Sequence, residues 1–204
     1  MDFNLTEQQK LMQKLFREVA ENEVKENAAD VDENERFPKE AVQVMRDAKM
    51  LGIPYPKEYG GAGADYLSYI LAVEELSKKC ATTGVVLSAH TSLGTWPIAQ
   101  FGTPEQKEKY LRPLASGEKL AAFGLTEPNA GTDAAGQQTT AVKDGDDYVI
   151  NGTKIFITNA GEADVYIIFA MTDKSKGTRG ISAFIVEKDT PGFTIGQHEK
   201  KLGI

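Results

Sequence analysis

Hydrophobic residues recur at a helical spacing over the first 118 residues of the chain. Thr6 and Gln9 form a capping box ahead of an apolar stripe with three- and four-residue intervals. The pattern predicts helices over about residues 7–27 and 38–52, a third helix capped by Asp65, and helices over about residues 85–101 and 104–117. Thr103 and Gln106 form a second capping box, and an acidic, solvated connector is expected at residues 30–35. Gly52 is expected to end the second helix. The buried face of the third helix is predicted to contain Leu67, Ile70, Leu71 and Leu76.

The period changes near Glu118, where short runs of β-branched and aromatic residues begin. They predict strands at residues 120–125, 139–143, 148–151, 154–158, 165–172 and 181–186, with a hairpin turn at residues 144–147. The expected fold class is therefore α+β: an all-α helical domain at residues 1–118, followed by an antiparallel β domain at residues 119–204. These strands are too few to close a barrel, so the β domain is expected to be incomplete and the chain to be the front part of a longer protein.

Composition excludes several classes of function. The net charge is −7 and the basic residues are scattered, which argues against nucleic acid or an anionic membrane as a partner. One cysteine, Cys80, and two distant histidines, His90 and His198, provide no metal-ligand cluster. The first residues lack the basic and apolar pattern of a signal peptide, and no apolar run is long enough to span a membrane. A cytoplasmic location is the simplest expectation.

The stretch from Phe123 to Asp133 is the first candidate for chemistry. A short apolar strand gives way to turn-forming residues, with hydroxyls at Thr126 and Thr132. Backbone N–H groups at a strand end that have no sheet partner suit a polar, partly anionic ligand. An ordinary Pro/Gly turn explains the same composition, and these residues alone leave both interpretations open. The chain has neither a dinucleotide-binding glycine fingerprint nor a phosphate-binding loop.

In their order along the chain, several motifs resemble those of the acyl-CoA dehydrogenases, most closely the bacterial butyryl-CoA (short-chain) enzymes. Residues 123–133, FGLTEPNAGTD, are similar to the first signature of that family, and residues 154–159, KIFITN, to the second at the family's spacing. Further matches are YGGAG at 59–63, AVEEL at 72–76, QFGTPEQK at 100–107 and TPGF at 190–193. The resemblance covers essentially the whole chain. Phe156 stands where the family often has Trp, and Thr132 where Ser is commoner.

The resemblance implies an activity and a cofactor. Family members are flavoprotein oxidoreductases of fatty acid metabolism, and they convert an acyl-CoA thioester into a trans-2-enoyl-CoA. A carboxylate takes a proton from Cα while hydride leaves Cβ for FAD, whose chemistry the protein positions. No catalytic residue is assigned here, because the resemblance places the base beyond residue 204 in an absent C-terminal helical bundle. The 204 residues are therefore expected to be inactive alone. Glu127 is rejected as the base and expected to make a structural hydrogen bond or ion pair.

The resemblance also assigns site residues. For FAD, Leu125 and Thr126 would face the pyrimidine side, Phe156 would pack on the ring system and Thr158 would reach N5, while Gly131 and Thr132 would meet the pyrophosphate. The full set of cofactor-binding candidates is Phe123, Leu125, Thr126, Gly131, Thr132, Phe156, Ile157 and Thr158. The substrate candidates are Thr132, beside the CoA chain, and Val85, Ser88, Ala89 and Ser92, for the acyl cavity. From the residues alone, Phe156 and Thr158 fit alternating strand positions, and the four from Val85 to Ser92 fit a packed core helix.

The resemblance implies two protein partners and leaves alternatives open. An electron-transferring flavoprotein would accept the electrons, and a full-length protein would form a homo-oligomer, either a dimer or a tetramer. An acyl-CoA oxidase or a decarboxylating relative is an alternative enzyme, which oxygen consumption would distinguish. A non-catalytic flavin or acyl-CoA binding module is an alternative of another class.

Overall fold

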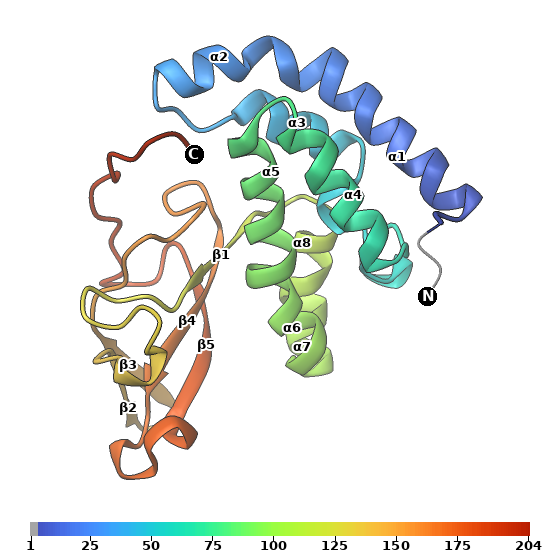
Figure 1. Cartoon of the computed structure of the whole chain (residues 1–204). Coiled ribbons are helices and arrows are strands. Elements are labelled where there is room, and N and C mark those ends of the chain that lie inside the picture. Colours follow the sequence, from blue (N-terminus) through green and yellow to red (C-terminus); the bar gives the residue numbers. More distant parts are fainter. Residues whose placement is uncertain (1–3) are drawn as a thin grey trace. The chain divides into compact units, whose positions relative to one another are not determined.

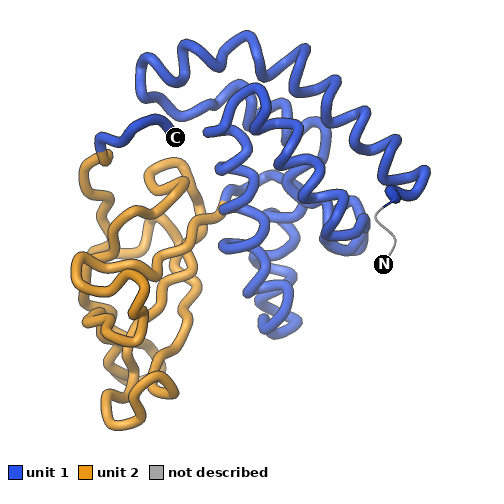
Figure 2. The backbone as a smooth tube through the Cα atoms, viewed as in Figure 1, with its two compact units in different colours: residues 1–120, 200–204 blue, residues 121–199 orange. Residues whose placement is uncertain are grey.

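The computed structural model describes residues 4–204 (Figure 1). The chain divides into two compact units, residues 1–120 with 200–204 and residues 121–199 (Figure 2). The first unit is built from helices and the second from a five-stranded sheet. This order of helices and then strands confirms the predicted α+β class.

The first unit begins with a long, nearly continuous helical run. Helix α1 (Glu7–Val19) passes into a π-helical turn, η1 (Ala20–Val24), and then into α2 (Lys25–Glu33). The predicted capping box is present: the Gln9 amide donates to the Thr6 hydroxyl at 3.2 Å, and the Thr6 amide donates to the Gln9 side chain at 2.9 Å. The run continues beyond the predicted end at residue 27, because Val31 is buried and anchors its last turn. The prediction of an acidic connector over residues 30–35 was therefore wrong for most of that segment.

The remaining helical segments are shorter. They are α3 (Lys39–Asp47), η2 (Met50–Gly52), η3 (Lys57–Tyr59), α4 (Tyr66–Ser77), α5 (Ala81–Ser88), η4 (Ala89–Thr95), α6 (Trp96–Phe101), α7 (Pro104–Gln106), η5 (Lys107–Leu111) and α8 (Arg112–Ala115). Side chains begin two of them as the sequence predicted, since Asp65 accepts from the Ser68 amide at 2.7 Å and Thr103 forms a second capping box. Among residues 4–204, no helix combines the length and apolar character that crossing a membrane requires.

Apolar packing and one buried carboxylate hold α1 against α4. The shared core includes Phe16, Ala20, Leu71, Ala72 and Leu76. Glu75 is 2% exposed and accepts two hydrogen bonds from the Arg17 guanidinium, at 3.0 and 3.1 Å. The Arg17 bonds outweigh the effect of burial and lower the pKa of Glu75. The α1–α4 contact therefore joins hydrophobic burial to a bidentate ion pair.

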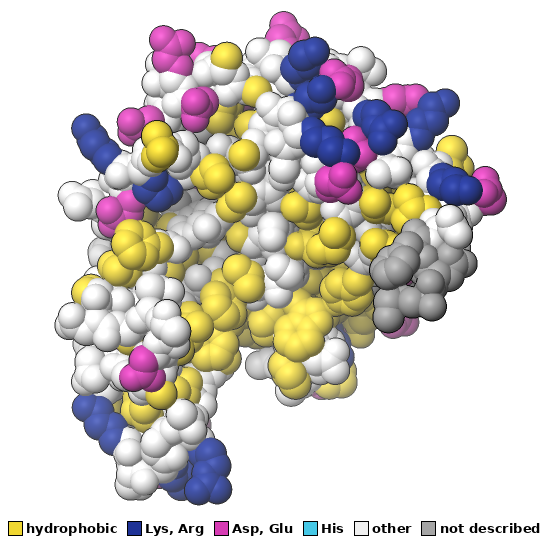
Figure 3. All heavy atoms as spheres, viewed as in Figure 1, with side chains coloured by type: hydrophobic (Ala, Val, Ile, Leu, Met, Phe, Trp, Pro, Cys, Tyr) yellow, Lys and Arg dark blue, Asp and Glu magenta, His cyan; other side chains and the backbone are white. Residues whose placement is uncertain are grey.

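Two residues predicted for the core of α4 are instead at the surface. Leu67 and Ile70 are 45% and 52% exposed, whereas Leu71 and Leu76 are buried as predicted. Helical periodicity identifies an apolar stripe, but only the packed neighbours decide how much of its width is covered. Figure 3 shows further apolar side chains at the surface of the helical unit. The large exposed ones in this unit include Leu11, Leu15, Leu93, Trp96 and Phe101.

Gly52 serves a different purpose from the predicted helix stop. Helix α3 already ends at Asp47, and Lys49 adopts the left-handed conformation, with φ 54°, that follows it. A Cβ on Gly52 would overlap the Ala115 carbonyl oxygen and lie 3.0 Å from the Gly61 Cα. All of these neighbouring atoms belong to the backbone, which cannot rotate away as a side chain can. The close approach of three backbone segments thus requires glycine here.

We expect Gly52→Ala to destabilise the helical unit by about 1–3 kcal/mol or more, because the added methyl must displace backbone. Urea denaturation followed by circular dichroism at 222 nm measures the change. Gly196→Ala is the matched control, because a Cβ there meets nothing within 4 Å. Equal stabilities for the two variants would contradict the assigned close approach.

Strand β4 (Val165–Met171) is the central strand of the second unit. It pairs in parallel with β1 (Ala121–Gly124), antiparallel with β5 (Ile181–Glu187), and in parallel through one residue pair with β2 (Thr140–Asp144). β2 and β3 (Asp147–Asn151) form the predicted hairpin, in which Gly145 has a positive φ of 61°. Six of the seven β4 residues are buried, as expected for a strand with neighbours on both sides.

The sheet is mixed, which corrects the expectation of a purely antiparallel domain. Antiparallel neighbours can be joined by a short turn, whereas parallel neighbours need a long crossover. The segment between Gly124 and Val165 is long enough for such a crossover, and it contains the β2–β3 hairpin. Strand-like residues predicted the existence of the strands, but their pairing depends on this connection.

Candidate functional site

The first candidate segment leaves the sheet at the end of β1. Phe123 is half-buried within the strand, and its ring lies 5.1 Å from the ring of Phe169 on β4. The chain then makes a tight turn, in which the amides of Glu127 and Ala130 donate to each other's carbonyl oxygens at 3.0 and 3.1 Å. Leu125 and Thr126 are half-buried just before the turn, and Gly131 and Thr132 are exposed just after it.

Glu127 holds the turn together from inside. Its side chain is 5% exposed and accepts hydrogen bonds from the backbone amides of Gln138 at 2.5 Å and Thr139 at 3.0 Å. The ammonium of Lys154, itself 8% exposed, lies 2.7 Å from the Glu127 carboxylate. A buried charge requires this kind of pairing. The expectation that Glu127 makes a structural ion pair is confirmed.

The surroundings of Glu127 make it a poor base. Burial alone would raise the pKa of this carboxyl, but hydrogen bonds from the Gln138 amide, the Lys154 ammonium and Thr139 reverse that effect. Together they lower the pKa of Glu127 to about 2. Both carboxylate oxygens are already acceptors within the turn, so neither is directed at a substrate.

The second candidate segment, residues 154–158, is not the predicted strand. It makes no strand pairing, and Phe156 has a left-handed φ of 57° that interrupts an extended chain. The Ile155 amide instead donates to the Thr126 carbonyl at 2.9 Å, which joins the two segments directly. At the far end, the Asn159 side-chain amide donates to the Ala121 carbonyl at 3.1 Å. The prediction from alternating side chains was wrong because these anchors, and not a sheet ladder, fix the backbone.

The two anchors leave three predicted site residues between them. Phe156 is 64% exposed, whereas Ile157 and Thr158 are half-buried. Ile157 packs against a small core that includes Ala122 and Tyr166. The segment therefore has an exposed aromatic ring at Phe156 and, two residues later, a half-buried hydroxyl at Thr158.

The two segments contain a set of backbone and hydroxyl donors without partners in the described part of the chain. Within residues 4–204, the backbone N–H groups of the predicted cofactor residues outside β1 make no hydrogen bond to the chain, and neither do their hydroxyls. These residues are Leu125, Thr126, Gly131, Thr132, Phe156, Ile157 and Thr158. Partly buried N–H groups need partners from water or from a ligand. The structure thus joins seven predicted residues in two linked segments and places Phe123 in the adjoining strand.

Sequence reasoning missed Lys154 and Asn159 as the residues that fix this arrangement. A signal for Lys154 was available, because it is the one charged residue in the run from Val149 to Gly161. A lone charge within an apolar and hydroxyl-rich run is costly to bury unless a partner compensates it. That signal points to a buried ion pair but does not identify the partner.

The predicted acyl-cavity residues occupy one face of a helical run in the first unit. Val85 and Ser88 are half-buried on α5, and Ala89 and Ser92 follow on the π-helical η4, where Ala89 is 4% exposed. The Ser92 hydroxyl donates to the Ser88 carbonyl at 2.8 Å. π-Helical turns within α-helices are frequent at functional sites. This placement is compatible both with a cavity wall and with a packed core.

His90 and Cys80 belong to the helical core. His90 is fully buried, and its Nε2 lies 3.2 Å from the Leu114 carbonyl oxygen. Burial lowers the pKa of His90 to about 4 despite hydrogen bonds to the backbone, so the ring is neutral at pH 7. Cys80 is a buried free thiol at the start of α5. Over residues 4–204, no group of three or more acidic, histidine or cysteine residues is placed to bind a metal ion.

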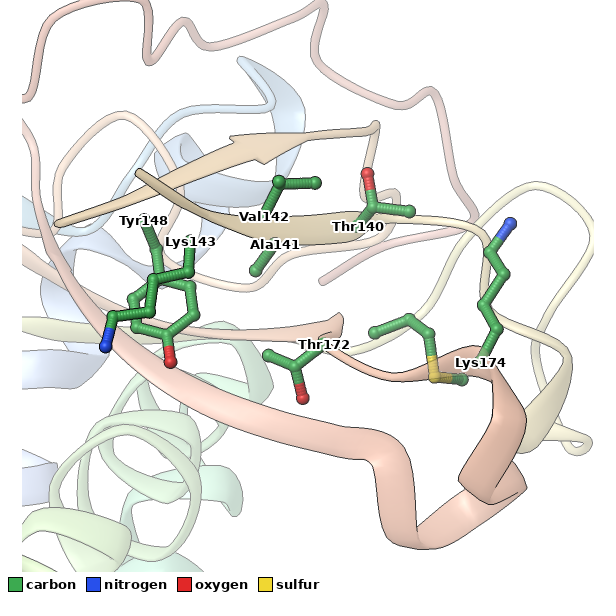
Figure 4. A pocket seen from close by; sticks show the side chains of 8 residues that line it. Thr140, Ala141, Val142, Lys143, Tyr148, Thr172 and Lys174 are labelled. Carbon is green, nitrogen blue, oxygen red and sulfur yellow. The ribbon is translucent and has the colours of Figure 1, made fainter. Parts of the chain in front are cut away.

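A separate hollow lies along the β2–β3 hairpin and the end of β4 (Figure 4). Its lining includes Lys143, Tyr148, Thr172 and Lys174. None of the predicted site residues lines it, so it is distinct from the two donor-bearing segments.

Two family models match the chain, one in each part. The model of the N-terminal domain of acyl-CoA dehydrogenases matches residues 6–118, and that of the middle domain matches residues 122–204. The chain belongs to the acyl-CoA dehydrogenase family. The resemblance inferred from residues 123–133 and 154–159 is thereby confirmed.

Individual relatives agree with this assignment. The short-chain-specific acyl-CoA dehydrogenase of Clostridium acetobutylicum is 66% identical over all 204 residues, which is 54% of its own length. The solved butyryl-CoA dehydrogenase of Megasphaera elsdenii is 53% identical with a TM-score of 0.94, over 98% of this chain and 54% of that one. A chain in a study of the electron-transferring flavoprotein of Acidaminococcus fermentans is 55% identical, with a TM-score of 0.95 over 98% of this chain and 53% of that one. The chain thus spans about half the length of the relatives it matches.

The lowered pKa of Glu127 yields a pH-dependent prediction. The pKa of this carboxyl is about 2 in the folded state and 4.5 in the reference state. Its contribution to the free energy of unfolding is therefore full above pH 4.5 and is lost as the pH falls towards 2. We expect Glu127→Gln to lower the free energy of unfolding by about 3 kcal/mol at pH 7, with a smaller difference at pH 3. Urea denaturation at several pH values measures it.

Glu199→Gln is the matched control, because Glu199 is an exposed carboxylate in the same unit. We expect it to change stability by less than about 0.5 kcal/mol. A Glu127→Gln deficit that stays constant from pH 7 to pH 3 would contradict the proposed origin of the stability.

Proposed function

We propose that this chain is the helical and middle portion of an FAD-dependent acyl-CoA dehydrogenase that acts on a short-chain, butyryl-CoA-like substrate. The whole protein converts the thioester into a trans-2-enoyl-CoA and passes electrons to an electron-transferring flavoprotein. The observation that carries the proposal is the set of unpaired donors at residues 125–132 and 156–158, in a chain 66% identical to a short-chain-specific enzyme.

The donor set fits the polar groups of a flavin. An isoalloxazine ring has carbonyl oxygens and ring nitrogens at one edge and a flat apolar face, and the dinucleotide adds a pyrophosphate. N–H and hydroxyl donors complement the oxygens and the phosphates, and the exposed ring of Phe156 complements the face. Two solved relatives that are 35–39% identical to this chain contain FAD or FADH2.

Each predicted cofactor residue has a role in this proposal. Leu125 and Thr126 would hold the pyrimidine edge, Gly131 and Thr132 would hold the pyrophosphate, and Thr132 would also meet the CoA chain. Phe156 would pack on the ring, and the Thr158 hydroxyl would donate to N5 and stabilise negative charge there. Phe123 and Ile157 support these residues from the strand and from the small core. When bound, FAD would supply the acceptor for the hydride that leaves Cβ.

The base that takes the Cα proton is proposed to lie beyond residue 204, in a helical bundle that also completes the acyl pocket and the oligomer contacts. Within the two segments, Glu127 cannot serve, because its pKa is about 2 and its oxygens are committed to the turn.

We expect the 204-residue protein to purify without bound FAD, to bind added FAD only weakly and to show no butyryl-CoA oxidation. Absorbance at 450 nm measures retained flavin, and reduction of an artificial electron acceptor measures activity. A yellow preparation that reduces the acceptor with butyryl-CoA would contradict the placement of the base beyond residue 204. Oxygen consumption by the complete enzyme distinguishes an oxidase from a dehydrogenase.

A separate prediction concerns the length of the acyl chain that the complete enzyme accepts. If Ala89 lines the acyl cavity, Ala89→Leu in the complete enzyme shortens the cavity and lowers kcat/KM most for the longest acyl-CoA that is accepted. We expect a loss of about tenfold or more for that substrate, with little change for shorter ones. Rates across a series of acyl-CoA lengths measure this.

Ala81→Leu is the matched control, because Ala81 is exposed at the start of α5, the helix that leads into η4. An unchanged chain-length profile in Ala89→Leu would assign Ala89 to core packing alone.

A further inference from the structure

Lys154 makes three hydrogen bonds from a nearly buried ammonium. Its Nζ donates to the Leu125 carbonyl at 3.0 Å, to the Glu127 carboxylate at 2.7 Å and to the Gln137 side-chain oxygen at 3.1 Å. An ammonium has three N–H donors, so this set uses its full capacity. The Glu127 carboxylate compensates the charge, and the Leu125 carbonyl is bound in addition to that pair.

The bond to Leu125 sets the direction of an adjacent donor. In a trans peptide, the C=O of one residue and the N–H of the next point in opposite directions. Because Lys154 holds the Leu125 carbonyl, the Thr126 N–H points away from Lys154, and it has no partner within residues 4–204. The ammonium therefore fixes an unpaired donor without touching it.

The following peptide is fixed in the same way. The Thr126 carbonyl accepts from the Ile155 amide at 2.9 Å, and the next N–H, on Glu127, donates to the Ala130 carbonyl at 3.0 Å. Residues 154 and 155 thus hold two consecutive peptides of the first segment. One N–H of the pair is used inside the turn, and the other is left for a ligand.

We propose that Lys154 is a positioning residue that holds the Leu125–Thr126 peptide with its N–H directed at the flavin ring system. The identity of that ligand rests on the proposed function. The Glu127 carboxylate, 2.7 Å from Nζ, compensates the buried ammonium charge and holds the side chain in place. Orienting a donor before the ligand arrives removes part of the ordering cost of binding.

The first test compares amide spectra of the flavin-free, 15N-labelled 204-residue protein. Lys154→Met keeps the length and apolar stem of the side chain but removes all three donors. The Thr126 amide signal is expected to shift or broaden, because the hydrogen bond on the preceding carbonyl is lost. An unchanged Thr126 signal in folded Lys154→Met would overturn the proposal.

A double variant separates positioning from stability. Lys154→Met alone leaves the Glu127 carboxylate buried without its cation, so a stability loss is expected whether or not Lys154 positions the peptide. Glu127→Gln combined with Lys154→Met removes that charge and should recover part of the stability. The Thr126 signal should stay displaced in the double variant, and its return to the position in the unaltered protein would overturn the proposal.

The second test adds FAD up to millimolar concentration and follows the same amide signals, which detects weak binding. The dissociation constant is expected to rise by about tenfold, equivalent to about 1.4 kcal/mol, in both the single and the double variant. Lys188→Met is the matched control, because it removes an exposed lysine paired with Asp164 at 2.9 Å in the same unit. Equal affinities for FAD in the Lys188→Met control and in the folded double variant would overturn the proposed role of Lys154.

The two proposals fail in different ways. If FAD leaves the spectrum of the unaltered protein unchanged, the proposed flavin site is contradicted. The comparison of flavin-free spectra still decides whether Lys154 orients the Leu125–Thr126 peptide.

Discussion

The buried ion pair between Glu127 and Lys154 is the interaction on which the candidate site depends. A carboxylate and an ammonium that are each less than a tenth exposed must compensate each other, and here every remaining donor and acceptor of the pair also finds a backbone or amide partner. The pair joins two segments that lie 27 residues apart in sequence. Removing either partner would therefore both expose a charge to an apolar setting and release the backbone of the turn.

This arrangement explains how polar backbone can remain unpaired without disordering the turn. Strand β1 ends at Gly124, and the following residues leave the ladder of hydrogen bonds that would otherwise use their N–H groups. Side-chain hydrogen bonds fix the backbone in place of the sheet's hydrogen bonds. Glu127 accepts from two backbone amides downstream, Lys154 donates to the Leu125 carbonyl upstream, and Asn159 donates to the Ala121 carbonyl. These side chains hold the backbone, while N–H groups such as that of Thr126 keep no hydrogen-bond partner within residues 4–204.

Local sequence signals correctly predicted the features that depend on neighbouring residues, namely helix caps and a hairpin turn. The capping residues Thr6, Asp65 and Thr103 each begin a helix, and the turn around Gly145 closes the predicted hairpin. The segment from Lys154 to Thr158 was wrongly predicted as a strand, because its β-branched and aromatic residues satisfy the pattern while its backbone follows long-range bonds. Gly52 was misassigned for a related reason: the Ala115 carbonyl that excludes a side chain there is far away in sequence. Motif order identified the candidate site, but the anchors that build it depend on contacts that spacing alone does not specify.

The same ion pair also limits which chemistry these residues can perform. A base for the Cα proton of a thioester must be free to approach it and must hold the proton well enough near neutral pH. Glu127 meets neither condition, because the bonds that give the turn its shape also lower its pKa to about 2 and occupy both oxygens. The hydrogen bonds that fix the turn therefore commit the Glu127 carboxylate to structure. This commitment of Glu127 agrees with the proposed position of the base beyond residue 204.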